Sequence, residues 1–420
     1  MILFVICLVL FTIYFLREIY HKRIFEIVNV FLLSFFLRFY LFSPLISSGF
    51  VFSTFYYTKF KPELQLVYDI SAIILLISTF ISRGLFTNYF LAFKERVNST
   101  NIFIKFFNFI LIYTGVYYIS MGVTPPVLSP FFGESTLKNR LLLTYNKVNE
   151  SILFYGNTVF KDYLLQNASV ILVFQYIKKK KYFFYALIAF FFIMYIGRKS
   201  SIANYILFLG FTLYNFKFLK LKGLVKIFLI VLIILILLFS IYGATDFLFD
   251  IGLRALIIES SFSYFQYDLY INNPQVGINI FNFPGSEIIF NIENFDIKKD
   301  TYEQVFPSRV DASGDRNAQG FAPLLLIIAF GKSIGYFIYF IISLFTLTYL
   351  RILQRSIKFN INNHYYFALY FLTISLSMNY FGVNIFSIFD FTIINFKYFI
   401  FLMFLLIFTN IKLKYYVYYK

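Results

Sequence analysis

Charge, cysteine and tryptophan are the scarce components of this sequence. Charged residues make up 14% of its 420 residues, against about 25% in a soluble globular protein, and 60% of the residues are hydrophobic. This composition excludes a soluble globular protein and indicates an integral membrane protein. Nine prolines and 18 glycines are too few for a low-complexity or disordered chain, and the lone Cys7 excludes an intrachain disulfide.

Long apolar runs dominate the sequence instead. Because about 20 apolar residues are needed to cross the hydrocarbon core, we expect an all-α polytopic membrane protein with about 11 transmembrane helices (10 to 12) in a single domain, residues 1–420. The first run lacks a basic leader and a small-residue cleavage site, so we expect it to be a retained span. The expected windows are 1–16, 24–46, 64–82, 102–120, 160–177, 182–197, 200–216, 224–243, 320–349, 365–389 and 392–411.

The basic residues are unevenly distributed between the connections. Six alternate connections hold 20 of the 37 Lys and Arg residues but only two acids, Glu18 and Glu95. Since cytoplasmic loops carry the excess of Lys and Arg, we expect these six to be cytoplasmic, with the N-terminus outside and the C-terminus inside. They are residues 17–23, 83–97, 178–181, 217–226, 351–358 and 412–420.

Two longer connections fall on the opposite, extracytoplasmic face. The large loop at 244–319 contains 11 acids and five cations, and the outer loop at 121–159 begins with a turn-rich stretch that holds three prolines. Loops carried on a rigid scaffold commonly hold binding and catalytic residues. We therefore expect the working surface on this face.

Arg198 and Lys199 stand side by side on this outer face, in a short join between two apolar runs. Arginine presents a planar fork of donors that matches phosphate oxygens, and Lys199 adds a point charge. Ser200 follows at the start of the next helix, where hydroxyls and free amide groups bind anions. The alternative interpretation is interfacial anchoring, with both cations snorkelling to lipid headgroups.

A second charged cluster precedes the ninth window. Arg309, Asp311, Asp315 and Arg316 lie within eight residues of one another. Guanidinium groups at a membrane mouth can hold an anionic leaving group, and a carboxylate can take a proton from a hydroxyl nucleophile. The alternative is a solvated loop with local ion pairs, and for Arg254 it is a place on an amphipathic surface segment.

Two charges fall inside the windows at similar depth. Arg38 and Asp69 are both roughly 8–9 Å below the outer boundary at 1.5 Å per residue. Because intramembrane charges usually pair or face a wet cavity, we expect a structural Arg38–Asp69 ion pair. A role of the two residues in a functional cavity is the alternative.

The layout and several short motifs carry a resemblance. The motif positions are Gly197, Arg198, Ser200, Asn317, Gly320, Pro323, Phe330, Gly331 and Gly335, and the layout is many spans with a large, late outer loop. Together they resemble the Wzy-type polymerases of lipid-linked oligosaccharide repeat units, which make O-antigen and capsule. Arg309 and Gly320 have the Arg-to-Gly spacing of some members, with ten intervening residues, whereas Arg198 and Gly210 miss it by one.

The resemblance implies a GT-C-like architecture in the bacterial inner membrane with the active site on the periplasmic face. The family transfers a growing glycan from undecaprenyl diphosphate to the next lipid-linked repeat unit. The implied partners are the undecaprenyl-diphosphate-linked oligosaccharide, membrane lipid and a chain-length regulator protein, with no nucleic acid.

The candidate site residues follow from the chemistry of a diphosphate leaving group. No D-x-D pair occurs in the chain, so we expect chemistry without a metal or another cofactor. The candidate catalytic residues are Arg198 and Arg316, with Asp311 or Asp315 as base, and the candidate substrate-binding residues are Lys199, Ser200, Arg254 and Arg309.

Two other functions remain open. O-antigen ligases resemble the polymerases but typically carry a histidine in the large outer loop. Here His21 and His364 both fall in connections expected to be cytoplasmic, which favours a polymerase. A flippase or transporter of lipid-linked sugars would line a central cavity with charges from several spans, whereas this chain concentrates its polar residues in outer loops.

Overall fold

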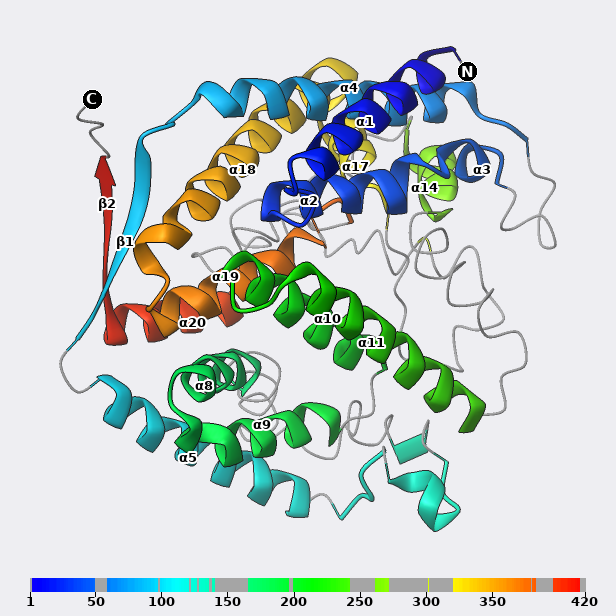
Figure 1. Cartoon of the computed structure of the whole chain (residues 1–420). Coiled ribbons are helices and arrows are strands. Elements are labelled where there is room, and N and C mark those ends of the chain that lie inside the picture. The colour runs from blue at the N-terminus through cyan, green and yellow to red at the C-terminus, as the bar shows by residue number, and fades with distance from the viewer. Residues whose placement is uncertain are drawn as a thin grey trace, which may run out of the picture.

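The computed structural model is a helical assembly with one small sheet in the part of the chain that it describes (Figure 1). A described helix falls in each of the eleven windows expected from the sequence. The described residues are 2–49, 59–96, 99–120, 122–126, 128–135, 138–139, 165–195, 199–241, 261–271, 301, 320–378, 380–382 and 396–415.

Five described segments are long and apolar enough to cross a membrane, which is compatible with the expected helical membrane protein. In the second segment, a π-helical turn at Phe36–Tyr40 continues the helix. The third segment begins with Pro62, and a proline at this position loses no hydrogen bond, because the first amides of a helix have no partner within it. The segments are α1 (Ile2–Tyr20), the series α2 (Ile27–Phe35), η1 (Phe36–Tyr40) and α3 (Ser43–Ser47), then α4 (Pro62–Gly84), α5 (Ser99–Ser120) and α18 (Lys332–Asn360).

The other described helices are mostly shorter. Three of them have 13 residues, or about 20 Å, which is less than the hydrocarbon thickness of about 30 Å. The remaining helices are α8 (Gln166–Lys178), α9 (Phe183–Tyr195), α10 (Lys199–Asn215), α11 (Leu221–Ile241), α14 (Ser263–Tyr270), α17 (Ala322–Phe330), α19 (His364–Ser377) and α20 (Phe396–Phe408), with 3₁₀ turns at Ser129–Phe132 and Lys180–Tyr182.

The ninth window, 320–349, is two helices and not one. α17 ends at Phe330. Gly331 then adopts a φ of 79° that favours glycine, and α18 runs from Lys332 to Asn360. The basic segment 351–358, expected to be a connection, is therefore the last part of a helix. The reason is visible locally, because no glycine or proline interrupts the chain between residues 336 and 360.

The connection at 83–97 also differs from expectation. It contains β1 (Tyr89–Glu95), which pairs antiparallel with β2 (Thr409–Tyr415) in the C-terminal tail, with Leu91 opposite Leu413. The fold is thus mostly helical but not purely so. The pairing joins two segments that were both assigned to the cytoplasmic side.

The second edge of β1 is covered by polar side chains at the end of α18. The Leu91 amide donates to Ser356 Oγ at 2.8 Å, and the Phe93 amide donates to Asn360 Oδ1 at 2.9 Å. Asn360 Nδ2 donates back to the Leu91 carbonyl at 2.6 Å. These bonds satisfy backbone groups of an edge strand that would otherwise be open to pairing.

The six connections expected to be cytoplasmic meet at this end of the molecule. Glu18 pairs with Arg83 at 2.9 Å, and Arg355 Nη1 donates to the Phe86 carbonyl at 3.0 Å. Lys178 lies 5.1 Å from the centroid of the Phe218 ring and donates to the Asn362 side chain. We call this the basic end: residues 14–29, 79–96, 178–182, 214–226, 351–364 and 409–415.

The interior of the bundle is aromatic. The Phe321 ring stacks on Tyr68 at 4.4 Å between centroids and also contacts Phe35 and Phe39. α18 lies against α4, α2 and α17, so the two halves of the chain share one core. Aliphatic side chains such as Val9 and Ile13 on the outward face of α1 are exposed, as expected for a lipid-facing helix.

Candidate functional site

The candidate functional site lies where the acidic 244–319 loop meets the membrane domain. α14, the described helix of that loop, contacts α3 and α17 beside the first turns of α4 (Figure 1). Charged and hydroxyl side chains from four separate parts of the chain converge there. We call this the loop end: residues 40–47, 59–69, 261–271 and 320–335.

Lys61 joins α14 to the start of α4. Its ammonium donates to the Tyr264 carbonyl at 3.2 Å, lies 2.5 Å from an Asp268 carboxylate oxygen and sits 3.6 Å from the centroid of the Tyr264 ring. Burial lowers the pKa of Lys61, and the hydrogen bond and charge of Asp268 oppose that shift. Ion pairing and a cation–π contact thus hold the loop helix against the bundle.

The outer rim of this contact is weaker. The Tyr267 hydroxyl donates to Glu63, and Lys332 lies 3.9 Å from the same carboxylate with both side chains well exposed. Burial raises the pKa of Tyr267, and the hydrogen bond and charge of Glu63 raise it further. Tyr267 therefore remains a neutral donor.

Beneath α14, the chain enters the membrane domain on its way into α17. The Tyr68 hydroxyl lies 2.5 Å from Ser263 Oγ, so the loop helix is bonded directly to a buried residue of α4. A Cβ at Gly320 would lie 1.8 Å from Gln266 Oε1, so this position accepts only glycine while Gln266 keeps its place. The residue that follows the large loop, Gly320, therefore lies directly against Gln266 of α14.

Asp69 is the buried carboxylate of the loop end. It accepts hydrogen bonds from the Tyr40 hydroxyl at 3.0 Å and from Gln65 Nε2 at 3.1 Å, and its exposed fraction is 2%. Gln65 in turn donates to Ser43 Oγ at 3.0 Å. Asp69 is seven positions after Pro62, which places it about 10 Å below the start of α4. The cluster provides a buried acceptor with neutral donors around it.

The expected Arg38–Asp69 ion pair is replaced by other bonds. Arg38 Nη1 donates to the Met378 carbonyl at 2.6 Å, whereas Asp69 bonds to Tyr40 and Gln65. Among the described residues, the ion pairs within 4.0 Å do not include Arg38 with Asp69. Arg38 and Asp69 were expected to pair because they lie at similar depth, but their side chains bond to different neighbours.

The α17–α18 hairpin explains the residue type at three of the motif positions. Pro323 lies in the first turn of α17, and Gly331 makes the turn between the helices. A Cβ at Gly335 would lie 2.7 Å from the Ile327 Cα, so the two helices approach at backbone distance. These residues shape the turn and the close contact between α17 and α18.

Most of the predicted site residues lie outside the described part of the chain. Lys199 and Ser200 are the first described residues of α10. The other candidates, Arg198, Arg254, Arg309, Asp311, Asp315 and Arg316, belong to the residues that the structure does not describe. Their roles stay predictions.

Both histidines lie at the basic end. His21 is exposed in the turn after α1, and His364 Nδ1 lies 2.7 Å from a Glu95 carboxylate oxygen. His364 is therefore engaged with β1. Neither histidine is near the loop end.

The sequence did not single out Lys61, Tyr264 and Asp268. Lysine before Pro62 and an acid in a loop are common features, so only their contact distinguishes them. Comparison with protein-family models, with curated proteins and with solved structures finds no match to this chain. The site is thus defined by its own geometry.

Proposed function

We propose that this chain is a Wzy-type polymerase that transfers a growing glycan from undecaprenyl diphosphate to the next lipid-linked repeat unit, as in O-antigen or capsule synthesis. The observation that supports it best is the docking of α14 over the polar cluster of Tyr68, Asp69 and Gln65. A lipid-linked substrate carries its reacting bond at the membrane boundary. A polar cluster about 10 Å below the start of a span suits that depth.

The proposed reaction is a displacement at the anomeric carbon of the donor sugar. The acceptor hydroxyl oxygen forms a bond to that carbon, the bond from the carbon to the diphosphate oxygen breaks, and Asp311 or Asp315 takes the hydroxyl proton. Arg198 and Arg316 stabilise the charge that develops on the leaving diphosphate. Binding residues in the proposal are Lys199, Ser200, Arg254 and Arg309, and no metal or other cofactor takes part.

The chain connection supports a site near the loop end. Arg316 precedes Gly320 by four residues, and four residues of chain reach at most about 14 Å. Gly320 lies against Gln266 of α14. The proposal therefore has the diphosphate bind beside α14, with about 11 spans in a GT-C-like layout in the bacterial inner membrane and a chain-length regulator as a further partner.

The direct test is an Arg198→Ala variant that replaces the wild-type copy in the native cells. We expect loss of chain extension at unchanged protein level, because one of the two diphosphate contacts is removed. Lys298→Ala, which removes a cation from the same face outside the proposed clamp, should leave polymer length unchanged. Normal polymer in the Arg198→Ala cells would overturn the assignment.

Gene deletion separates the proposed function from the two alternatives. A polymerase deletion leaves single repeat units attached to their final acceptor and no polymer. Deletion of a ligase leaves polymer on the lipid carrier, and deletion of a flippase or transporter leaves repeat units on the cytoplasmic side. Either of the last two results would contradict the proposal.

The sidedness of the site has its own test. In a Cys7→Ser background, a membrane-impermeant thiol reagent applied to intact spheroplasts should label a cysteine placed at Ser313. It should not label one placed at Lys180, in the basic 3₁₀ turn before α9. The reverse pattern would place the large loop in the cytoplasm and exclude a reaction on the outer face.

A further inference from the structure

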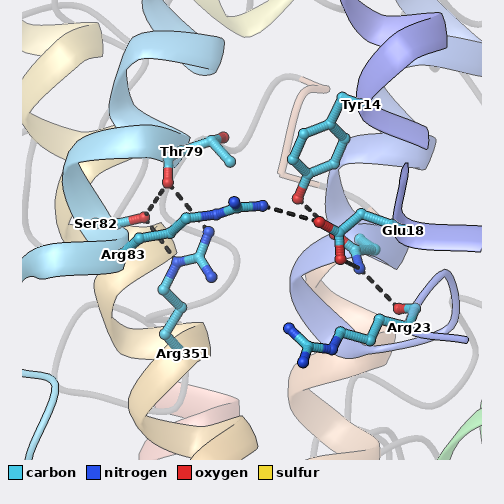
Figure 2. Close-up of polar contacts among 8 residues, drawn as sticks. Tyr14, Glu18, Arg23, Thr79, Ser82, Arg83 and Arg351 are labelled. Atoms are coloured by element: carbon cyan, nitrogen blue, oxygen red, sulfur yellow. Dashed lines mark hydrogen bonds and ion pairs between the residues drawn. The ribbon is translucent and has the colours of Figure 1, made fainter. Parts of the chain in front are cut away.

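A cavity of about 220 Å³ opens at the basic end, far from the loop end, and its walls are strongly charged. It lies between the end of α1, the start of α2 and the ends of α4 and α18 (Figure 2). Four arginines and two glutamates line it. They are Arg23, Arg83, Arg351, Arg355, Glu18 and Glu26.

One part of the cavity wall is electrically balanced. Arg83 reaches from α4 to Glu18 on α1, with 2.9 Å between Nη2 and Oε1 (Figure 2). Asn29 Nδ2 donates to the other Glu18 oxygen at 3.3 Å, and the Tyr14 hydroxyl donates to Asn29 Oδ1 at 2.6 Å. Both carboxylate oxygens of Glu18 therefore have partners among the residues that line the cavity.

The other three arginines have no carboxylate within 4.0 Å among the described residues. Arg351 donates to Ser82 Oγ at 2.9 Å and to the Thr79 carbonyl at 3.1 Å, both of which are neutral acceptors. Arg355 likewise donates to a carbonyl, that of Phe86. These bonds fix the guanidinium groups in place without neutralising their charge.

Arg23 completes the set from the α1–α2 turn. Its side chain lines the cavity, and the structure gives its guanidinium no hydrogen bond to a described residue. The Arg23 contact drawn in Figure 2 is through its carbonyl, which accepts from Asn29 at 2.7 Å. Glu26, the remaining acid, makes no described ion pair. Burial raises the pKa of Glu26, and the charge of Arg23 opposes that shift. Burial thus favours the neutral form of Glu26, which would leave the cavity with a larger net positive charge.

From this arrangement we infer that the cavity is a binding site for a phosphate group. Like charges brought together in a partly buried space repel one another, and a bound anion would relieve that repulsion. Arginine forks match phosphate oxygens in pairs, and Arg351 and Arg355 are already oriented by their neutral partners. The volume suffices for one phosphate with its hydrogen-bonded waters. This inference does not depend on the proposed glycan transfer.

Two sources could supply the phosphate group. The helices α1 and α4, which supply lining residues of the cavity, also carry exposed apolar side chains near those residues in sequence, namely Leu16, Ile19 and Phe80. The acyl chains of an anionic lipid could lie against them while its headgroup enters the cavity. A soluble phosphate would enter from the aqueous side past the exposed Arg23. The same guanidinium groups would bind either one.

The test uses the full-length protein in nanodiscs and measures its thermal unfolding midpoint. One arm adds inorganic phosphate to phosphatidylcholine discs, with chloride at equal ionic strength as reference. The other arm replaces part of the phosphatidylcholine by phosphatidylglycerol. We expect a higher midpoint in at least one arm, because a ligand that binds only the folded state stabilises it.

Arg23→Gln is the informative variant, because no described hydrogen bond of the fold uses this guanidinium. We expect it to weaken phosphate or lipid binding about tenfold, the usual effect of losing one charge-assisted bond. Arg23→Lys should restore part of the affinity. Arg17→Gln is the matched control, because Arg17 is an exposed arginine near the end of α1 that does not line the cavity, and it should leave binding unchanged.

The arms also identify the source. A response to phosphatidylglycerol alone assigns a lipid headgroup, a response to phosphate alone assigns a soluble anion, and both responses show that the phosphate group itself is recognised. No response in either arm would overturn the inference. Equal loss of binding in Arg17→Gln and Arg23→Gln would also overturn it, because that would be general surface attraction.

Discussion

The loop end and the basic end each hold a buried carboxylate, Asp69 and Glu18, but the partners of the two carboxylates differ. At the loop end, Asp69 is surrounded by neutral donors, the Tyr40 hydroxyl and the Gln65 amide. At the basic end, Glu18 is paired with Arg83. Asp69 has no described ion pair, so it remains free to bind a substrate group or a cation, whereas the paired Glu18 already has its partner within the fold.

Cations show the reverse relation. At the loop end both described ion pairs match one lysine with one acid, Lys61 with Asp268 and Lys332 with Glu63. At the basic end, the arginines in one cavity outnumber the acids by two. The loop end therefore uses charge to attach a segment of the chain, and the basic end accumulates charge beyond what the fold needs.

The largest expected effect is at the loop end, where α17 and α18 touch. Gly335→Val should lower the free energy of unfolding by about 3 kcal/mol, since a Cβ there meets backbone atoms that cannot move aside. Thermal unfolding in detergent measures it. Gly84→Ala is the control, because a Cβ at Gly84 has nothing within 4 Å. Equal midpoints for the two variants would show that the hairpin contact does not hold this end together.

Removal of the paired carboxylate tests the basic end. Glu18→Gln should lower the free energy of unfolding by about 2 kcal/mol. This value lies between those for buried and for surface ion pairs, because the Glu18 side chain is 7% exposed and that of Arg83 is 30% exposed. Glu26→Gln is the matched change in the same cavity and should cost little, as Glu26 has no described ion pair. If both variants unfold alike, the distinction between paired and surplus charge at this end is wrong.

Attachment of the loop helix should depend on one lysine. Lys61→Gln removes the ion pair and the cation–π contact and should weaken the docking of α14 by about 1–2 kcal/mol. Hydrogen exchange of residues 263–270, followed by mass spectrometry, should rise. Lys332→Gln breaks the longer, exposed pair to Glu63 and should leave this exchange unchanged. A rise in both variants would mean that general charge, and not Lys61, positions α14.

How much of this was predictable differs between helices and contacts. Every expected window contains a helix, because a long apolar run is a local signal that does not depend on distant residues. The strand at 89–95 was missed because its partner lies more than 300 residues away in the tail. Its other edge depends on Ser356 and Asn360, which only the extended α18 brings alongside.

The polar contacts show the same limit more sharply. The depth of Asp69 was readable from helical rise, but its partners were not, because depth leaves the direction of a side chain undetermined. Lys61 and Asp268 are separated by about two hundred residues and have no distinguishing sequence context. The arginines of the basic end were identified as a cytoplasmic charge excess, and only the fold shows that four of them line one cavity.

The smallest expected effect concerns the ion pair that joins β1 to α19. Burial alone would raise the pKa of Glu95, but the hydrogen bond and charge of His364 outweigh it and hold that pKa below its ordinary value of 4.5. The pair therefore contributes stability above pH 4.5, and this contribution is lost as the pH falls below 4.5 through the folded-state pKa.

Because the Glu95 side chain is 34% exposed, solvent screening limits the contribution to about 0.5 kcal/mol. Thermal unfolding of the wild type and of Glu95→Gln should therefore differ at about pH 6 and converge in more acid buffer. In a His364→Gln background, the same Glu95→Gln change should have no effect at either pH, since the partner is absent. A pH-independent difference would show that β1 is held by its backbone and Asn360 bonds, with no contribution from charge at this part of the basic end.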